Sequence, residues 1–311
     1  MYSLFLGAGF SKWAVNLPLV SELFDFNIDV FSPSDQKRIE LVKSLKTAWD
    51  GLHPSENNEQ FITFALGLSE EEKQAVLWYI ARRLSEPFIW REFHAQRWRR
   101  HVLMIDENRK FQAKGLIQAR DFLQGFLAPS IAGIITTNYD LVVEYALGSR
   151  LFNYGIEDQI LIGRGPYPVS TWSHPVRLKG RLTVAKLHGS VSWDSGGYYT
   201  DGRRSITGNA LIVAPTSEKD IPEVLRFTWD LAGQILKQST RLLVFGFAFS
   251  AYDQLVLELL RFNGHNIRSI LLIDIAPKAE AVQQIWPQAT ISCCPPPPDG
   301  SALIYKWKES L

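Results

Sequence analysis

The stretch that most constrains the fold is Ile134-Ile135-Thr136-Thr137-Asn138-Tyr139-Asp140. Apolar residues run into a small polar cluster, and an apolar segment with helical spacing follows. This order predicts a buried strand that ends in a polar loop and opens a helix, which Asp140 would cap. Ligands of open parallel sheets bind outside the carboxyl ends of the strands, so Asn138 and Asp140 are candidate ligand-binding residues. Taken alone, however, the stretch favours a simpler interpretation, a turn residue and a helix cap.

The same arrangement recurs along the chain. In each case an apolar run ends in a polar or glycine-containing turn: residues 2–11, 182–190 and 241–250, with a shorter example at 210–216. Strands that alternate with helices predict an α/β protein with a parallel sheet. We therefore expect a Rossmann-like, doubly wound and mostly parallel sheet.

The first turn, Gly7-Ala8-Gly9-Phe10-Ser11, follows the apolar run at residues 2–6. A strand that enters a Gly-x-Gly turn and then a helix brings backbone amides against a phosphate. The third glycine of the dinucleotide motif is missing, because position 12 is Lys12. Tight strand-to-helix turns also use glycine for steric reasons alone, so both interpretations stay open.

Two further polar residues stand at predicted strand ends. His188 precedes Gly189, where exposure and close backbone approach are expected, and histidine is the natural base near neutral pH. A lone histidine is nevertheless more often structural. Asp274 ends the apolar run at 269–275, a position that commonly binds ribose hydroxyls. The alternative is that Asp274 caps the helix expected from Pro277.

Residues 33–128 show helical periodicity and lack a convincing strand. We predict one domain in which residues 1–30 and 129–311 form the Rossmann-like core and residues 33–128 form a helical insertion. Residues 57–60 and 69–72 have the composition of helix starts. The tail at 303–311 is expected to be a strand or a docked segment.

Residues 90–110 mix basic and aromatic side chains in a pattern that can contact a nucleic-acid backbone. Acidic residues dilute the charge, so a helix facing solvent or another subunit is favoured. The net charge of the chain is +1, which gives no field for nucleic acid or an anionic membrane. We expect direct nucleic-acid binding to be weak or absent.

The chain has two cysteines, the neighbours Cys293 and Cys294. They exclude a zinc module of four cysteines and a disulfide framework. Every apolar run is too short to cross a membrane, and the first residues lack the pattern of a signal peptide. A cytoplasmic protein without a membrane partner is expected.

Four strand-end clusters, taken in order, resemble the motifs of the sirtuin superfamily. They are Gly7-Ala8-Gly9-Phe10-Ser11, Thr136-Thr137-Asn138-Tyr139-Asp140, Lys186-Leu187-His188-Gly189-Ser190 and the loop from Phe245 to Ser250. Each motif is weak by itself. Together they span nearly the whole chain, which makes the resemblance specific.

The resemblance implies roles for the residues of these clusters. In the sirtuin pattern, Asn138 and His188 would be catalytic, with His188 as the general base. The residues implied to contact NAD are Gly7, Ala8, Gly9 and Ser11 at its phosphates, Asp140 at the nicotinamide ribose, and Gly246 and Asp274 at the adenosine half. NAD would be a substrate in this reaction.

The chain also departs from protein-deacylating sirtuins. It lacks the zinc module and the Pro-x-Phe-Arg element, and Ala248 replaces the serine of the Gly-Thr-Ser loop. With Asp253 further on, this loop is similar to that of zinc-free sirtuin-like domains in bacterial defence systems. The similarity implies an NAD+ hydrolase (NADase) that depletes NAD during phage infection. The alternatives are an NAD- or ADP-ribose-binding scaffold and a protein deacylase.

An uncontrolled NADase would kill its host, and no sensor domain is evident in the sequence. Control is therefore expected from assembly or from another polypeptide. We expect a homo-oligomer that works with a separate sensor or activator protein, either a HerA-like DNA-translocating ATPase or an argonaute.

Overall fold

The computed structural model describes residues 1–28, 32–95, 107–148, 151–155, 182–194, 197–198, 210–215 and 221–310. Of residues 87–95, 107–113 and 197–198 it describes the backbone alone. Most of the basic–aromatic segment at 90–110 and all of residues 156–181 lie outside the described residues. The prediction for the basic–aromatic segment therefore stays a prediction.

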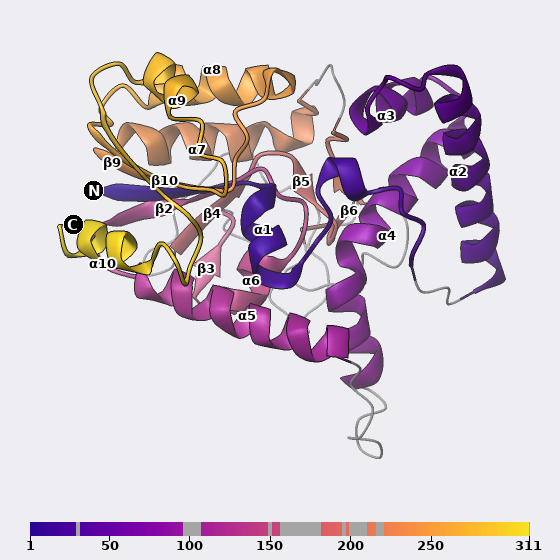
Figure 1. Ribbon diagram of the computed structural model, residues 1–311, viewed down its shortest axis with the longest axis horizontal. Coiled ribbons are helices and arrows are strands. Elements are labelled where there is room, and N and C mark those ends of the chain that lie inside the picture. Colours follow the sequence, from indigo (N-terminus) through magenta and orange to yellow (C-terminus); the bar gives the residue numbers. More distant parts are fainter. Residues whose placement is uncertain are drawn as a thin grey trace.

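A seven-stranded parallel sheet forms the centre of the molecule, in the order β11-β10-β9-β1-β2-β4-β3 (Figure 1). Its strands are β1 (Tyr2–Leu6), β2 (Ile131–Thr136), β3 (Phe152–Asn153), β4 (Leu182–Lys186), β9 (Arg241–Phe245), β10 (Ser269–Ile273) and β11 (Thr290–Cys294). The chain builds outward from β1 to one edge and then returns to the other side of β1 for the last three strands. This reversal makes the sheet doubly wound. The predicted fold class is confirmed.

Helices cover both faces of the sheet, which explains why its central strands are almost continuously apolar (Figure 1). One face carries α7 (Arg226–Lys237), α8 (Gln254–Asn263) and α9 (Ala279–Ile285). The other face carries α1 (Ala8–Val15), α5 (Glu107–Gly125), α6 (Val142–Leu147) and α10 (Ser301–Glu309). The strands thus separate two apolar cores, and their carboxyl ends remain for a site.

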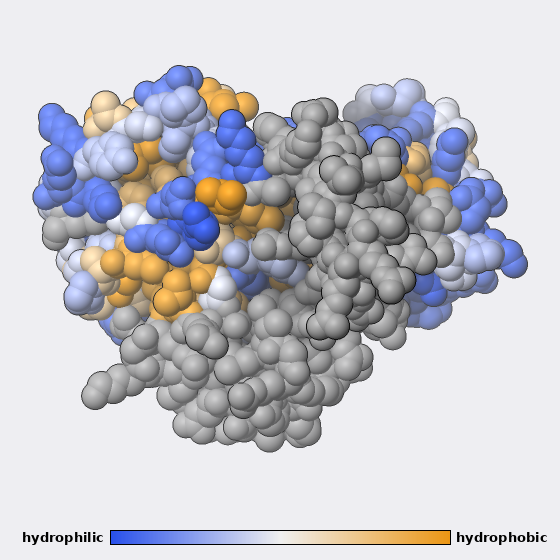
Figure 2. All heavy atoms as spheres, turned by 90° about the horizontal axis from the view of Figure 1, so that it is seen from below, coloured by the Kyte–Doolittle hydropathy of each residue, from blue (hydrophilic) through white to orange (hydrophobic). Residues whose placement is uncertain are grey.

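Between α1 and β2 the described chain forms four further α-helices: α2 (Pro33–Leu52), α3 (Asn58–Leu66), α4 (Glu70–Ala95) and α5. The predicted start of α3 is confirmed as a capping box between Asn57 and Gln60. Figure 1 shows α2, α3 and α4 as a lobe beside the sheet, whereas α5 runs along the sheet. On the face shown in Figure 2 this lobe is mostly hydrophilic, and hydrophobic side chains gather on the sheet-bearing part. The exact boundary between core and insertion stays a prediction.

The tail forms helix α10 and not a strand, so that alternative was wrong, whereas docking is confirmed. Ile304 and Trp307 are three residues apart, which places both on one helical face, and both are buried. The Trp307 ring packs edge-on against Tyr2 of β1. The short tail therefore gains its stability from contact with the central strand.

Shorter elements differ from the sequence expectations as well. After α1, residues Val20–Glu22 form a single 3-10 turn, η1. The strand expected at 210–214 is β8 (Leu211–Ile212), which pairs antiparallel with β5 (Gly189–Ser190) outside the main sheet. The remaining elements are a β6–β7 pair (Trp193–Asp194 and Gly197–Tyr198), η4 (Glu223–Leu225) and η5 (Ala251–Asp253). None of the described helices is long and apolar enough to cross a membrane.

Candidate active site at the carboxyl ends of the strands

A cleft of about 680 Å³, open mouth included, lies at the carboxyl ends of β1, β2 and β4. The core contributes residues of the turns that follow these strands, and α3 and α4 of the insertion contribute one residue each. The lining residues are Ala8, Ser11, Leu17, Pro18, Val20, Leu23, Glu59, Leu84, Thr137, Asn138, Tyr139, Asp140, His188, Pro215 and Asp253. Five residues predicted to form the site therefore meet in one cleft: Ala8, Ser11, Asn138, Asp140 and His188.

The side chain of Asn138 is held in one orientation. Its Nδ2 donates to the carbonyl oxygen of Gly7 and to Oγ of Ser11, both at 2.9 Å. A backbone carbonyl can only accept, so the amide nitrogen must face Gly7. Both amide hydrogens are engaged by protein acceptors, which leaves the carbonyl oxygen Oδ1 as the part available to a ligand. Asn138 is 6% exposed and lines the cleft.

Asp140 is buried next to this amide. Its carboxylate accepts from the amide of Val142, the first residue of α6, at 2.9 Å. The N-cap position is Leu141, so Asp140 binds the start of the helix from one residue before the predicted cap. Burial raises the pKa of Asp140 above its usual value, while the charge of Lys186 and hydrogen bonds from Val142 and Ser11 oppose that rise. Ser11 thus donates to Asp140 and accepts from Asn138, and so joins α1 to the loop after β2.

The backbone of His188 is fixed on both sides. The amide of Leu187 donates to Thr136, and the carbonyl of His188 accepts from Val213, both at 2.9 Å. Gly189 has φ +80°, and a Cβ there would lie 2.1 Å from the carbonyl oxygen of Leu211. The residue after the histidine must therefore be glycine.

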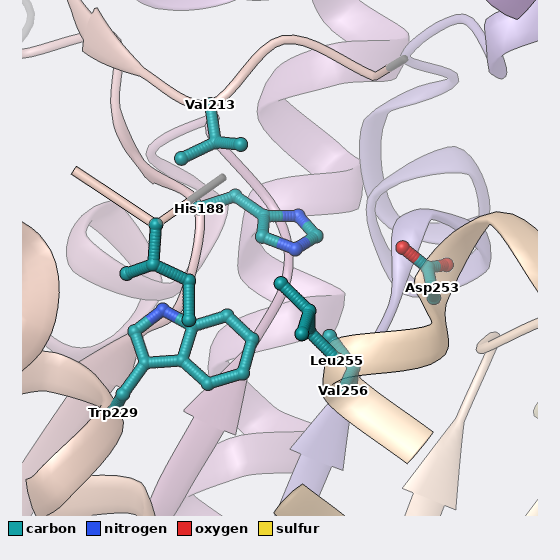
Figure 3. A pocket seen from close by; sticks show the side chains of 7 residues that line it. His188, Val213, Trp229, Asp253, Leu255 and Val256 are labelled. Carbon is teal, nitrogen blue, oxygen red and sulfur yellow. The ribbon is translucent and has the colours of Figure 1, made fainter. Parts of the chain in front are cut away.

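A second cavity lies behind the imidazole ring, as Figure 3 shows. It is lined by His188, Val213, Ile221, Trp229, Asp253, Leu255 and Val256. Trp229 is held there by a 2.9 Å hydrogen bond from Nε1 to the carbonyl of Leu187. Mostly apolar side chains surround this cavity, and it has room for no more than about one water molecule.

Two residues of the cleft were given no role by the sequence. Tyr139 donates to the carbonyl oxygen of Val213 at 2.6 Å, and its ring centre lies 5.9 Å from that of His188. Burial raises the pKa of Tyr139 well above its usual value, so the phenol stays a hydrogen-bond donor. Tyr139 and Val213 are 74 residues apart, so no local sequence pattern indicates this hydrogen bond.

Asp253 is the other such residue. It precedes α8, where an aspartate normally signals a helix cap, but its side chain makes no capping bond. It lines both cavities, and Figure 3 shows its carboxylate across from the His188 ring. Its only sequence signal was its place after the Phe245–Ser250 loop.

The glycine turn is shaped by contact with the loop after β9. The amides of Gly7 and Gly9 donate to the carbonyls of Phe245 and Gly246, both at 2.9 Å. A Cβ on Gly9 would lie 2.7 Å from Cα of Gly246, and a Cβ on Gly246 would lie 2.5 Å from the backbone of Gly9. The close approach of these two loops therefore accounts for the glycines of the Gly-x-Gly turn on steric grounds. The Gly9 amide is already engaged, whereas Ala8 at the start of α1 lines the cleft.

The family model for the SIR2-like domain matches residues 132–292, slightly more than half of the chain. The chain belongs to this family. A search of curated proteins found no match. Membership of the SIR2-like family, which includes NAD-dependent enzymes, implies NAD binding. The match contains Asn138, Asp140, His188, Gly246 and Asp274, and it begins after the Gly7–Ser11 turn.

Two SIR2-like positions lie apart from the residues that line the cleft. Gly246 has φ +65° and packs on Gly9. The carboxylate of Asp274 accepts from the amide of Ala276 at 2.9 Å and so stabilises the turn after β10. Contact of either residue with the adenosine half of NAD stays a prediction.

Within the described part of this SIR2-like chain, no three His, Cys, Asp or Glu side chains are grouped closely enough to hold a metal ion. Cys294 is buried, and burial together with the neighbouring Cys293 raises its pKa to about 11. It is therefore a poor source of thiolate at neutral pH.

Proposed function

We propose that this SIR2-like protein is an NAD+ hydrolase that cleaves the nicotinamide–ribose bond to give nicotinamide and ADP-ribose. The orientation of Asn138 supports this most directly. Its amide hydrogens are engaged by Gly7 and Ser11, so Oδ1 is pre-set to accept a hydrogen bond from a water or a ribose hydroxyl. His188 lines the same cleft, and an NAD-binding scaffold would have little need of both groups.

The reaction builds positive charge on the ribose ring as its bond to nicotinamide breaks. The electron pair of that bond leaves with the ring nitrogen of nicotinamide, and the oxygen of a water forms the new bond to the ribose carbon. The proton of the water passes to His188, which is suited to accept it near neutral pH. Fixed dipoles such as Oδ1 of Asn138 stabilise the developing charge without reorganising.

The cavity behind His188 favours water as the nucleophile. It is bounded by Val213, Trp229 and Leu255 and holds no more than about one water molecule. In a deacylase, an acyl chain must reach the same ribose carbon while NAD occupies the cleft. The cavity behind His188 has room for a water but not for such a chain, which favours the hydrolase over the deacylase alternative.

We further propose that the hydrolase is an effector that depletes NAD in bacterial anti-phage defence. This rests on the similarity of the Gly246–Ser250 loop and Asp253 to zinc-free sirtuin-like defence domains. In this proposal the protein works without zinc in the cytoplasm, as a homo-oligomer controlled by a separate partner. A HerA-like ATPase and an argonaute are the two candidate partners.

The test is release of nicotinamide from NAD+ by the purified protein, alone and with the product of its neighbouring gene. His188→Ala and Asn138→Ala should each lose most of the turnover while keeping the melting temperature of a folded protein. His265→Ala, which removes an exposed histidine before β10, is the matched control and should keep full turnover. NAD binding without nicotinamide release under either condition would support the scaffold, and NAD-dependent deacylation of a peptide would support the deacylase.

A further inference from the structure

A buried ion pair lies beneath the two catalytic loops. Nζ of Lys186 lies 2.8 Å from Oε1 of Glu144, and the two side chains are 1% and 0% exposed. The same ammonium group donates to the carbonyl oxygen of Asp140. Tyr154 donates to Oε1 of Glu144 at 2.9 Å and holds the acceptor in place. These four residues come from β4, α6, the loop after β2, and the segment after β3.

The pair is poorly explained as a source of stability. Removing two charges from water is costly, and apolar side chains of similar volume often serve a core equally well. Oε2 of Glu144, moreover, makes no hydrogen bond in the described structure, so the carboxylate is only half satisfied. A pair that stabilises little in net terms, but is specific in geometry, points to a positioning role.

Its location shows what it positions. Lys186 ends β4 two residues before His188, and it pairs in register with Thr136, which stands two residues before Asn138. The bond from Lys186 to the Asp140 carbonyl crosses from one strand end to the other. One ammonium group therefore ties the loop of Asn138 to the strand that carries His188.

The same ammonium group also acts through charge. Asp140 is buried, and two other charged groups in the described structure affect its pKa, Lys186 from β4 and Glu144 from α6. Lys186 favours the ionised carboxylate, and Glu144 opposes it more weakly. The ionised carboxylate accepts from Ser11, whose Oγ then accepts from Asn138. A chain of contacts thus runs from Lys186 to the catalytic amide.

We propose that Lys186, held by Glu144, is the positioning residue of this site: it fixes the two catalytic loops together and, through its contact with Asp140, sets the orientation of Asn138. This inference rests on the proposed NAD+ hydrolase. Lys186 does not line the cleft, so its effect on the reaction passes through Asp140.

Two variants separate position and charge from general stability. In Lys186→Met/Glu144→Leu an apolar pair replaces the ion pair, and kcat should fall between about tenfold and 100-fold with little change in KM. The acid limb of the pH profile of kcat should move to higher pH, because the buried carboxylate of Asp140 has lost its counter-charge. Glu144→Gln keeps the ammonium group and an acceptor, so it should retain most of kcat and move the acid limb to lower pH.

A matched control is Lys73→Met/Glu70→Leu, which removes an exposed pair on α4 and should change neither kcat nor its pH profile. Opposite shifts of the acid limb in the two buried-pair variants support the proposal. Unchanged kcat and acid limb in Lys186→Met/Glu144→Leu, or shifts in the same direction in both variants, would overturn it.

The pH dependence of the melting temperature tests the role of Lys186 without any measurement of turnover. If the wild type releases no nicotinamide, the proposed hydrolase function is wrong, but the role of Lys186 in holding the two loops can still be tested. As the pH rises through the titration of Asp140, the melting temperature of Lys186→Met/Glu144→Leu should then fall more than that of the wild type. The reason is that a carboxyl with a raised pKa destabilises the fold as pH rises through that pKa. Equal falls in the two proteins would overturn the role assigned to Lys186.

Discussion

The two sides of the site use the same sequence pattern in different ways. On the side of β2 and β4, the turns send the side chains of Asn138, Asp140 and His188 into the cleft or directly beneath it. On the side of β1 and β9, the turns interact mainly through backbone atoms, and Gly9 and Gly246 pack against each other. A strand followed by a polar or glycine-rich turn thus marks a ligand-lining loop in one half and a packing contact in the other.

The difference has a simple physical origin. Side chains with several polar atoms can satisfy protein partners and still present one atom to a ligand, as Asn138 does. Glycines present only backbone groups, and the Gly9 amide is already engaged by Gly246. Changes on the first side should therefore affect turnover, and changes on the second should affect stability or binding.

The largest expected effect is on the packing side. Gly246→Ala should lower the free energy of unfolding by about 3 kcal/mol, because φ is +65° and the new Cβ would lie 2.5 Å from the Gly9 backbone. Chemical denaturation measures this. Gly51→Ala in α2 is the control: its Cβ would meet nothing within 4 Å, so stability should rise by up to about 1 kcal/mol. Equal stability of the two variants would contradict the packing role.

On the side of β2 and β4, Asn138→Asp should reduce kcat by about 100-fold. The substitution keeps the shape of the side chain but places an oxygen opposite the Gly7 carbonyl, where only a donor fits. Steady-state nicotinamide release measures the loss, and the melting temperature reports the accompanying change in stability. Wild-type kcat in this variant would show that the orientation of the amide is unimportant.

Tyr139→Phe is expected to have a smaller effect. It removes the hydrogen bond to Val213 and should cost about 1 kcal/mol of stability. Because burial holds the pKa of Tyr139 well above 10, the phenol is neutral across the working range. The wild-type pH profile should therefore show no alkaline limb from this residue, and an alkaline limb that disappears in Tyr139→Phe would refute this.

The smallest expected effect is that of Asp274→Ala. If its carboxylate binds the adenosine ribose as the family pattern predicts, the Kd for NAD should rise by no more than about fivefold, equivalent to one hydrogen bond. kcat should stay unchanged, because Asp274 is not among the residues that line the cleft. Calorimetry gives the Kd, and Asp274→Asn, which keeps an acceptor for Ala276, separates the loss of charge from the loss of the turn. A lower kcat would show that Asp274 affects turnover as well as NAD binding.

Local signals were sufficient where one segment decides its own structure. The bounds of β1 and β2 match the apolar runs in the sequence, and the start of α3 follows from Asn57 and Gln60. The tail was less certain, because α10 depends on the contact of Trp307 with Tyr2. The short strand β8 likewise depends on its antiparallel pairing with β5.

The sequence by itself determined the alternation of the main strands and helices, the exclusion of a four-cysteine zinc module, and the candidates Asn138 and His188. The first two follow from periodicity and composition, and the two candidates follow from four short motifs taken together along the chain. The tertiary structure decided the orientation of Asn138, whose partners Gly7 and Ser11 are 131 and 127 residues away. It also decided the pairing of Lys186 with Glu144 and the placement of Asp253 beside His188. Contacts between distant segments arise only when the sheet brings the strand ends together, so no local pattern records them.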